Sequence, residues 1–421
     1  MHETSGNEAQ AVPTAGEQYA PFGKPPQNLP RHLPAPTTRV AAGGDVTIER
    51  IDLARKRDRK RFLDVADFIQ RGDPDYIAPL RMERMRFLDP AKNPAFRQLD
   101  VMALAAVRGG RDVGRITAHV DHAYDAHHGG KTAFFGFFES VDDQAVAHAL
   151  LHEAVAFAKA RGATELFGPC NFTMNHQVGM LVENFDRPPC VEMTYNPAWL
   201  QALVKSYGFG KAKDLLAYWI VTEAGIADPK MKRYFDISEK ARARYGLTLR
   251  GLDTKDFANE VARAFRMYNA TWEKNWGFVP VSEAEFVAIA HDLKPVLDPN
   301  LALFVEDREK NPVGFAVCLP DVNEVMPRNG RLFPFGWWKL LTGQKHIQWA
   351  RLIALGVVPE FRRKGVEAML AIHVALRAKE RGIHGGEISW TLEDNVLINR
   401  TIESFGAKLD RRYRIFGLDL R

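Results

Sequence analysis

The 421-residue sequence lacks the ~20 continuous apolar residues that a membrane-spanning helix needs. Its N-terminus also lacks the basic and then apolar order of a signal peptide, so we expect no export. It has only three cysteines, Cys170, Cys190 and Cys318, in apolar surroundings without metal-ligand spacing. We therefore expect buried, reduced thiols, no metal site and a cytoplasmic protein whose contact with the inner membrane, if it makes one, is peripheral.

The composition is that of a globular protein too long for one ordinary core. Hydrophobic residues make up 46% of the chain and charged residues 26%, and at 421 residues two packed domains are expected. The net charge of +5 and the pI of about 9.0 suit an anionic ligand, an acidic membrane surface or nucleic acid. Because no nucleic-acid-binding motif accompanies that charge, we do not expect nucleic acid as a partner.

Four segments follow one another along the chain. Residues 1–44 are rich in proline and poor in apolar residues, which predicts a disordered tail. Residues 45–222 and 247–421 read as two domains, joined by a polar helix over 223–246. In the first domain we predict strands at 46–51, 101–108, 113–122, 132–139 and 215–222, and helices at 58–70 and 142–161.

The second domain repeats this order of elements. We predict strands at 247–252, 301–306, 313–319, 347–357 and 387–391, helices at 256–272, 282–297, 365–381 and 395–404, and a terminal hairpin. Short sequence motifs also repeat: residues 158–162 (AKARG) match 378–382 (AKERG), and 208–211 (GFGK) match 406–408 (GAK). Two such pairs in the same order indicate a duplication.

A basic glycine turn follows an apolar strand at residues 355–365 (LGVVPEFRRKG) and leads into a helix. Such a turn points free backbone N–H groups and the positive end of the helix at an anion. Arg362, Arg363 and Lys364 add positive charge beside it. The alternative is a solvated, arginine-rich helix start. The strand, turn and helix together favour a cradle for a pyrophosphate.

This stretch, with its V-x-P and R-x-x-G, resembles the acyl-CoA motif of the GNAT (Gcn5-related N-acetyltransferase) superfamily. The resemblance implies an α/β fold of two tandem GNAT-like domains with mixed sheets flanked by helices. It also implies acyl-CoA as a co-substrate, with no permanently bound cofactor. By the family pattern, the backbone of Leu355 and Val357 pairs with the pantetheine, and Asn395 or Asn399 lies near the thiol. The pyrophosphate-binding residues would be Arg362, Arg363, Lys364, Gly365 and Val366.

Three features depart from a simple pair of GNAT domains. Glu367 stands where the family has a small residue, which leaves open a carrier protein in place of CoA as donor. The matching turn of the first domain, residues 139–143, is acidic and serves better as a helix cap. We therefore expect a degenerate first domain that supplies acceptor-side walls. Its insertion at residues 171–179, followed by 185–189, could face the thioester.

An amine must lose a proton before it attacks a thioester, which at pH 7 costs a lysine-like ammonium about 4 kcal/mol. The family's usual acidic and tyrosine positions are occupied by Arg351 and Ile402, so the standard pair is missing. The remaining candidates for the base are Glu387, Glu393 and His176. Each has an ordinary alternative: an exposed strand residue, a cap for the helix at 395, and a satisfied loop histidine.

The segment 331–341 (RLFPFGWWKLL) concentrates large apolar residues between basic ones. Either it is an excursion of the core, or it is an aromatic lip at a membrane surface, with Trp337 and Trp338 among the headgroups. In the second case Arg328, Arg331, Lys339 and Lys345 face anionic lipid.

Further phrases of the sequence at 179–189, 275–280, 319–323 and 389–395 resemble a bacterial group of tandem acyl-CoA N-acyltransferases that includes the ceramide synthases. The resemblance implies transfer of a long acyl chain to a sphingoid base, sphinganine or its 3-keto precursor. Two alternatives remain: N-acylation of a small polar amine or amino acid, and a non-catalytic acyl-CoA sensor.

Overall fold

A computed structural model of the chain describes residues 46–222, 229–273 and 275–421, so the predicted tail at 1–44 lies outside the described residues. The first half is made of strands, α-helices and a short 3-10 helix. They are β1 (Val46–Ile51), α1 (Lys56–Ile69), α2 (Arg81–Phe87), η1 (Pro94–Arg97), β2 (Leu99–Arg108), β3 (Arg111–Asp121), α3 (His122–His128), β4 (Thr132–Ser140), α4 (Gln144–Ala160), β5 (Glu165–Gly168), β6 (Met180–Glu183), α5 (Leu200–Tyr207) and β7 (Gly210–Val221).

The second half opens with the charged helix expected between the domains and then repeats the order of the first. It contains α7 (Pro229–Tyr245), β8 (Thr248–Gly251), η2 (Thr254–Asp256), α8 (Phe257–Trp272), α9 (Glu283–Leu293), η3 (Lys294–Val296), β9 (Ala302–Glu306), β10 (Pro312–Pro320), η4 (Val322–Glu324), α10 (Gly336–Gly343), η5 (Gln344–His346), β11 (Trp349–Val357), η6 (Pro359–Phe361), α11 (Val366–Glu380), β12 (Gly385–Leu392), α12 (Val396–Ser404) and β13 (Lys408–Asp419).

All strands join one mixed sheet in the order β1-β2-β3-β4-β5-β13-β7-β12-β11-β10-β9-β8, with β6 paired to β13. Neighbours are antiparallel except for two parallel pairs, β4 with β5 and β11 with β12. These two pairs occupy matching places in the two halves. The repeated order of elements predicted from the sequence is therefore confirmed, and the two copies share a single sheet.

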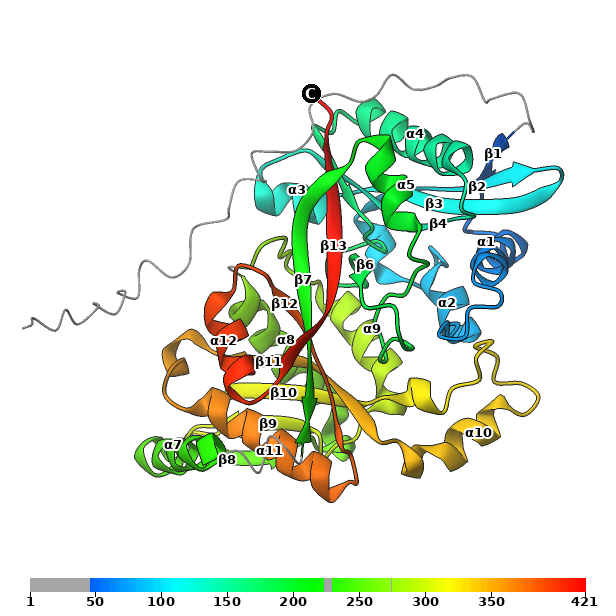
Figure 1. The fold of residues 1–421 in the computed structure, drawn as a ribbon. Coiled ribbons are helices and arrows are strands. Elements are labelled where there is room, and N and C mark those ends of the chain that lie inside the picture. The colour runs from blue at the N-terminus through cyan, green and yellow to red at the C-terminus, as the bar shows by residue number, and fades with distance from the viewer. Residues whose placement is uncertain (1–45, 223–228, 274) are drawn as a thin grey trace, which may run out of the picture.

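The last strands of the two halves are exchanged. Strand β13 pairs with β5 of the first half, β7 pairs with β12 of the second half, and the two long strands pair with each other (Figure 1). The predicted terminal hairpin is therefore wrong. The segments 208–211 and 406–408 each lead into one long strand, because the partner of each strand comes from the other half of the chain.

Each half buries an apolar layer between the sheet and one long helix. Helix α4 packs on the first half, where Phe135, Leu150 and Phe416 are fully buried. Helix α11 packs on the second half, where Val366 and Leu370 are also fully buried. Phe416 belongs to β13, so the C-terminal strand completes the core of the N-terminal half. All three cysteines are buried and free, as predicted.

Side chains cap the first turns of α4 and α9. Asp143 Oδ1 accepts hydrogen bonds from the backbone N–H groups of Ala145 (2.9 Å) and Val146 (3.2 Å) at the start of α4. Ser282 Oγ accepts one from the backbone N–H of Glu285 (3.2 Å) at the start of α9. The acidic turn of the first half thus serves as a cap, as the sequence predicted.

Helix α10 extends from the second half beside the first (Figure 1). The aromatic segment around it is not a core excursion, since Phe333, Phe335 and Trp338 are 73%, 80% and 61% exposed. Within residues 46–222, 229–273 and 275–421, the helices are all too short or too polar to cross a bilayer.

Candidate active site

Strands β11 and β12 separate part-way along their length. Their last pair among the described residues is Leu352↔Ile388, whereas the pairing of β11 with β10 continues to Gly314↔Val357. Residues 353–357 therefore turn one backbone edge away from β12. That edge carries N–H and C=O groups that can pair with an extended amide-containing chain.

The basic turn that follows β11 is held in shape by its own backbone and by α7. Gly365 has φ +88°, and a methyl group on it would lie 3.0 Å from both Ala241 Cβ and Ile237 Cγ2 of α7. Arg363 also has a positive φ, of 59°. Residue 365 must be glycine, because a side chain there would crowd α7 and would be strained at this positive φ.

The three basic side chains of the turn have different surroundings. Arg362 donates to the carbonyl oxygens of Val357 (3.2 Å) and Thr271 (2.9 Å), which ties the turn to β11 and α8. Lys364 Nζ lies over the ring of Tyr245, and both Arg363 and Lys364 are exposed. Arg363 and Lys364 are therefore the residues whose positive charge remains available to an anion in solution.

Glu367 places its carboxylate in the turn. Glu367 Oε1 accepts a hydrogen bond from the backbone N–H of Arg363 at 3.3 Å. Burial raises the pKa of Glu367, while the amides and the two nearby arginines oppose that shift. The carboxylate that departs from the family pattern therefore occupies one backbone amide of the turn.

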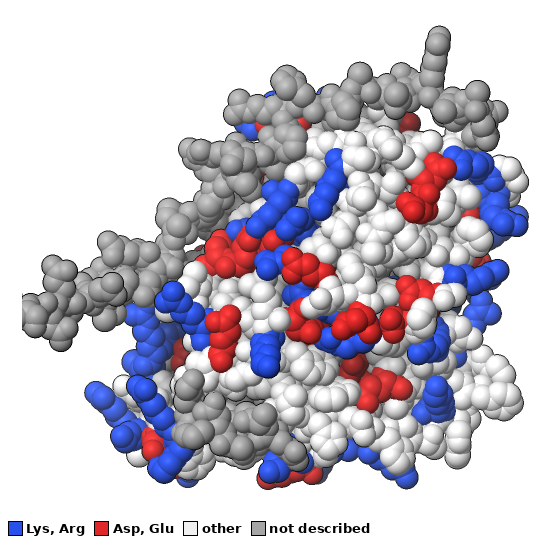
Figure 2. Space-filling model, viewed as in Figure 1, with Lys and Arg blue, Asp and Glu red and all other residues white. Residues whose placement is uncertain are grey.

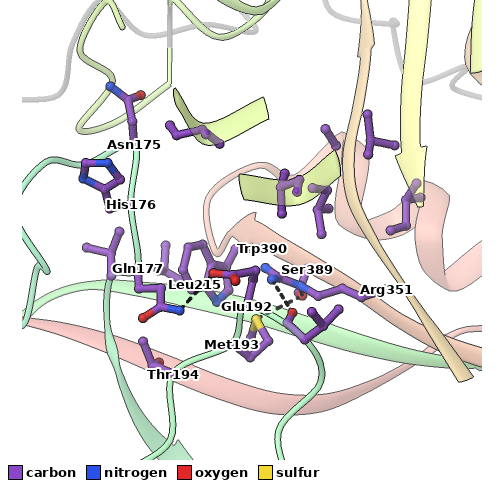
Figure 3. Close-up of a pocket in the computed structure, with 18 of the residues that line it drawn as sticks. Asn175, His176, Gln177, Glu192, Met193, Thr194, Leu215, Arg351, Ser389 and Trp390 are labelled. Atoms are coloured by element: carbon purple, nitrogen blue, oxygen red, sulfur yellow. Dashed lines mark hydrogen bonds between the residues drawn. The ribbon is translucent and has the colours of Figure 1, made fainter. Parts of the chain in front are cut away.

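A single cavity of about 1530 Å³ extends from this turn into the first half. Its donor side is lined by 353–357, Arg362, Arg363, Gly365 and Glu367, and Trp272 and Trp390 line its middle. Its far side is lined by residue 171 and residues 174–179 of the insertion. Figure 3 shows Asn175, His176 and Gln177 along one segment of the wall, with Arg351, Ser389 and Trp390 on another.

A buried polar cluster lies where β11 and β12 begin to separate. Arg351 Nε donates to Ser389 Oγ at 2.9 Å (Figure 3). Ser389 Oγ in turn donates to Glu387 Oε1 (2.6 Å), and Arg351 Nε lies 3.9 Å from Glu387 Oε1. Glu387 is 1% exposed, so the alternative of an exposed strand residue is wrong. Burial raises the pKa of Glu387, and the charge of Arg351 opposes this shift.

A second buried cluster joins the insertion to α9. Thr173 Oγ1 donates to Glu285 Oε1 (2.8 Å), and the backbone N–H of Thr173 donates to His176 Nδ1 (3.3 Å). His176 Nε2 lies 3.6 Å from Glu285 Oε1. Burial lowers the pKa of His176 to about 3 and raises the pKa of Glu285 to about 7. The imidazole is therefore neutral at pH 7.

Two curated proteins are similar to nearly the whole chain. Protein YghO of Escherichia coli (strain K12) is 36% identical over 368 residues, which cover 86% of this chain and 93% of that protein. The bacterial ceramide synthase of Caulobacter vibrioides (strain NA1000 / CB15N) is 36% identical over 372 residues, covering 85% and 94%. The chain belongs to the N-acyltransferase family that includes this ceramide synthase. No family model matches the sequence.

Solved structures share the fold of this GNAT N-acyltransferase. A tandem GNAT protein from the clavulanic acid biosynthesis pathway has a TM-score of 0.54 at 12% identity, covering 90% of this chain and 99% of that one. A GNAT glucosamine N-acetyltransferase region of a fungal β-N-acetylglucosaminidase has a TM-score of 0.50 at 13% identity, covering 90% and 38%. The predicted tandem GNAT architecture is thus confirmed.

Other residues singled out in this GNAT sequence hold the end of β12. Asn395 caps α12 by accepting from the backbone N–H of Ile398 (3.4 Å), and Asn399 Nδ2 donates to the carbonyl oxygen of Leu392 (2.9 Å). Asn395 lines the cavity, and Asn399 is buried beneath it. Lys364 and Val366 do not line the cavity, since Val366 faces the core.

Glu393 does not cap α12, because Asn395 occupies that position. Its carboxylate instead contacts Lys211 and accepts a hydrogen bond from the backbone N–H of Asp214 (3.0 Å). Glu393 is therefore part of the charged surface that joins β12 to β7, where acidic and basic residues alternate in Figure 2. It does not line the cavity.

Glu285 is the functional candidate that the sequence analysis missed. The spacing of Ser282 and Glu285 in the sequence is that of a capping box, in which the glutamate turns back to the helix start. In the structure only the serine caps, and the glutamate carboxylate contacts Thr173 and Gln98 instead. The sequence signal for this contact is weak: the polar residues of the insertion 171–179 must find hydrogen-bond partners when they are buried.

Proposed function

We propose that this N-acyltransferase moves a long acyl chain from acyl-CoA to the primary amine of a sphingoid base, giving a ceramide. The observation that carries the proposal is the cavity of about 1530 Å³, which runs without interruption from the basic turn to the first half. Sites for drug-sized ligands span about 300–1,000 Å³, so this cavity has room for two chains. The name of the ceramide synthase from Caulobacter supports the same acceptor class.

The donor would enter along the second half, which we propose as the catalytic copy, spanning 247–421. The free edge of β11 at Leu355 and Val357 would pair with the pantetheine, and Gly365 with the neighbouring amides would bind the pyrophosphate. Arg363 and Lys364 are the exposed cations beside it. Residues 45–222 would supply the acceptor-side walls through their insertion.

The thioester would lie where β11 and β12 separate, and its acyl chain would enter the apolar part of the cavity. Each buried methylene stabilises the complex by about 0.8 kcal/mol, so acyl length should control binding strongly. Of the predicted bases, His176 lines this cavity, whereas Glu387 lies in the polar cluster with Arg351 and Glu393 at the surface. We propose that His176 belongs to the wall of the acyl-transfer site. We also propose that Glu387 holds Arg351 in position.

The aromatic lip, residues 331–341 around α10, supports a peripheral contact with an anionic bilayer as the source of both substrates. Phe335 and Trp338 are exposed, and Arg328, Arg331, Lys339 and Lys345 are exposed among them. Asn329, next to the lip, lines the cavity. A lipid substrate could therefore pass from a bilayer into the cavity without crossing a wide stretch of water.

The test uses purified protein with palmitoyl-CoA and sphinganine, with thiol release and the N-acyl product both measured. We expect product from the wild type and a rise of at least about 10-fold in the KM for palmitoyl-CoA in the Arg363→Glu, Lys364→Glu variant, since two charges near a pyrophosphate are reversed. The Lys379→Glu, Lys408→Glu variant carries the same charge change on distant exposed residues and should behave as wild type.

Two other results would redirect the proposal. Turnover with palmitoyl-carrier protein and not with palmitoyl-CoA would make the carrier protein the donor, for which Glu367 in the phosphate turn is the structural reason. Turnover of amino acids or small polar amines with no turnover of sphinganine or 3-ketosphinganine would exclude the sphingoid base.

A further inference from the structure

Glu285 is a buried carboxylate without a strong cationic partner. Its side chain is 1% exposed, and His176 is the only basic side chain placed within 4.0 Å of it among the described residues. Ion pairs and hydrogen bonds normally offset the free energy of burying a carboxylate. Here the partners are one hydroxyl, from Thr173, and one amide, from Gln98 at 3.4 Å.

The groups around Glu285 place proton donors near its carboxylate. The backbone N–H of Thr173 donates to His176 Nδ1, so the neutral imidazole carries its proton on Nε2, which lies 3.6 Å from Glu285 Oε1. The hydroxyl of Thr173 lies 3.0 Å from His176 Nδ1 and donates to Glu285 Oε1 at 2.8 Å. The hydroxyl and the Nε2–H group thus favour the charged form of the carboxylate, whereas burial opposes it.

Helix α8 links this cluster to the donor strand. Tyr268 on α8 donates its hydroxyl to Asn175 Oδ1 in the insertion (3.1 Å). One turn further along α8, Thr271 and Trp272 lie against β11, so closely that a methyl group on Gly356 would be 2.9 Å from Thr271 Cγ2. Glu285, His176, Asn175, Tyr268 and Gly356 all line the same cavity.

We propose that Glu285 is the general base of the reaction and that Thr173 and His176 position it. The proposal rests on the N-acyltransferase function and names its proton acceptor. The carboxylate removes one proton from the substrate ammonium, and the free amine attacks the thioester carbonyl, forming the C–N bond. When the tetrahedral intermediate collapses, the C–S bond breaks and the departing thiolate takes the second proton from nitrogen. The products are the amide, the thiol and a protonated Glu285, which then releases its proton to water.

The acidity of Glu285 fits this role. Its pKa of about 7, raised by burial, makes it half ionised near neutral pH, where a general base is most effective. The charged and titratable groups around the cluster are His176, His119 on β3, Asp121 before α3, Arg84 on α2 and Tyr268 on α8. His119 is fully buried and its pKa is lowered to about 4, so it is neutral in the same range. The pKa of Asp121 is raised to about 6 by burial, so its titration precedes that of Glu285.

The first experiment compares Glu285→Gln with Glu283→Gln, an exposed glutamate on the same helix. General base catalysis typically contributes about 10²- to 10⁴-fold, so we expect a kcat loss of that order in Glu285→Gln with an unchanged Kd for palmitoyl-CoA. The wild-type kcat/KM should rise with pH through about 7, because only the ionised carboxylate accepts a proton. Glu285→Gln should lose this rise, and Glu283→Gln should keep it.

The second experiment separates positioning from folding. Thr173→Val removes a hydrogen bond that favours the ionised form of Glu285, so the rising limb of its pH profile should move to higher pH, and Thr173→Ser should restore it. A purely structural role for Thr173 would lower activity without moving the limb. Thermal unfolding of each variant shows whether it is folded at the assay temperature.

The assay is first run with sphinganine and then with a panel of long-chain and small polar amines. If sphinganine is not acylated, the proposed acceptor is wrong, and the base is tested on the amine that supports thiol release. If Glu285→Gln keeps the wild-type kcat and pH profile on an amine that the wild type acylates, Glu285 is not the base, whatever the acceptor.

Discussion

Glu367 Oε1 lies 3.3 Å from the backbone nitrogen of Arg363 and accepts its hydrogen bond, inside the turn that would hold the donor phosphates. In the donor site that we propose, a pyrophosphate would have to displace a carboxylate of the same charge sign. Without a ligand, that carboxylate satisfies an amide that would otherwise be open to water.

We expect Glu367→Gln to lower the KM for palmitoyl-CoA by about 3- to 10-fold, since a like charge close to a phosphate opposes binding by about 1 kcal/mol in a solvated site. The kcat should change little, because the reacting atoms are at the other end of the pantetheine. Glu360→Gln is the matched control, as Glu360 is an exposed carboxylate in the same turn. An equal KM change in both variants would attribute the effect to net charge alone.

The exchange of β7 and β13 makes the two halves depend on each other for stability. Phe416 is fully buried in the first-half core, although it belongs to the last strand of the chain. We expect Phe416→Ala to lower the free energy of unfolding by about 3–5 kcal/mol through the cavity it creates. Urea unfolding followed by tryptophan fluorescence and by circular dichroism should give one coincident transition. Two separate transitions would show that the halves unfold independently.

Most secondary structure was predictable because each element has its own apolar period. The strand β1, the hairpin of β2 and β3, and the turn before α11 were placed within a few residues of their observed bounds. The exchange of β7 and β13 was not predictable, because both strands carry the same alternating pattern. That pattern does not indicate which strand each of them pairs with. Strand pairing at such distance along the chain is a property of the whole sheet.

The two clusters of the site show a similar limit. Glu387 lies on a strand with alternating residues, so the sequence does not show whether its side chain faces the interior or the solvent. The pairing of Glu387 with Arg351 in the sheet places both side chains in the protein interior. The position of Glu285 three residues after Ser282 matched a helix cap, and its true partner, Thr173, lies 112 residues earlier in the chain. Local patterns find helix ends reliably, but they do not indicate which capping residue also faces a cavity.

The buried carboxyl of Asp321 should make stability depend on pH. Burial raises the pKa of Asp321 to about 7, and Oδ1 accepts from the backbone N–H groups of Val191 (2.9 Å) and Asn323 (3.2 Å). The folded state keeps its proton at a pH where the unfolded state, with a pKa near 3.9, has released it. This stabilisation is fully present below about pH 4 and is lost as pH rises through 7.

We therefore expect Asp321→Asn to be more stable than the wild type at pH 8 by about 2–4 kcal/mol and to lose this advantage at pH 4, at 1.36 kcal/mol per pKa unit. Asp253→Asn is the control, because Asp253 is an exposed N-cap of a short 3-10 helix, as Asp321 is a buried one. Urea unfolding between pH 4 and pH 8 measures both. A constant difference across this range would contradict the assignment.

The aromatic lip allows a test of membrane binding that does not depend on activity. Figure 2 shows the corner of the molecule around α10 as a white surface with blue residues among it. Burying a large apolar side chain contributes about 1.5–3 kcal/mol, so Phe335→Ser with Trp338→Ser should weaken binding to phosphatidylcholine–phosphatidylglycerol vesicles by about 10²- to 10⁴-fold. Binding should also weaken as salt is raised, because Arg331 and Lys339 act through screened charges.

Leu409→Ser is the control for this variant, since Leu409 is an exposed apolar residue on β13, far from the lip along the chain. Vesicle sedimentation gives the bound fraction, and a short-chain, water-soluble acyl donor and amine give the activity without a membrane. We expect the lip variant to keep its activity on soluble substrates and to lose it selectively on substrates held in vesicles. Equal vesicle binding by the lip variant and the wild type would leave the exposed aromatic residues without a membrane role, and the substrates would then have to reach the cavity through water.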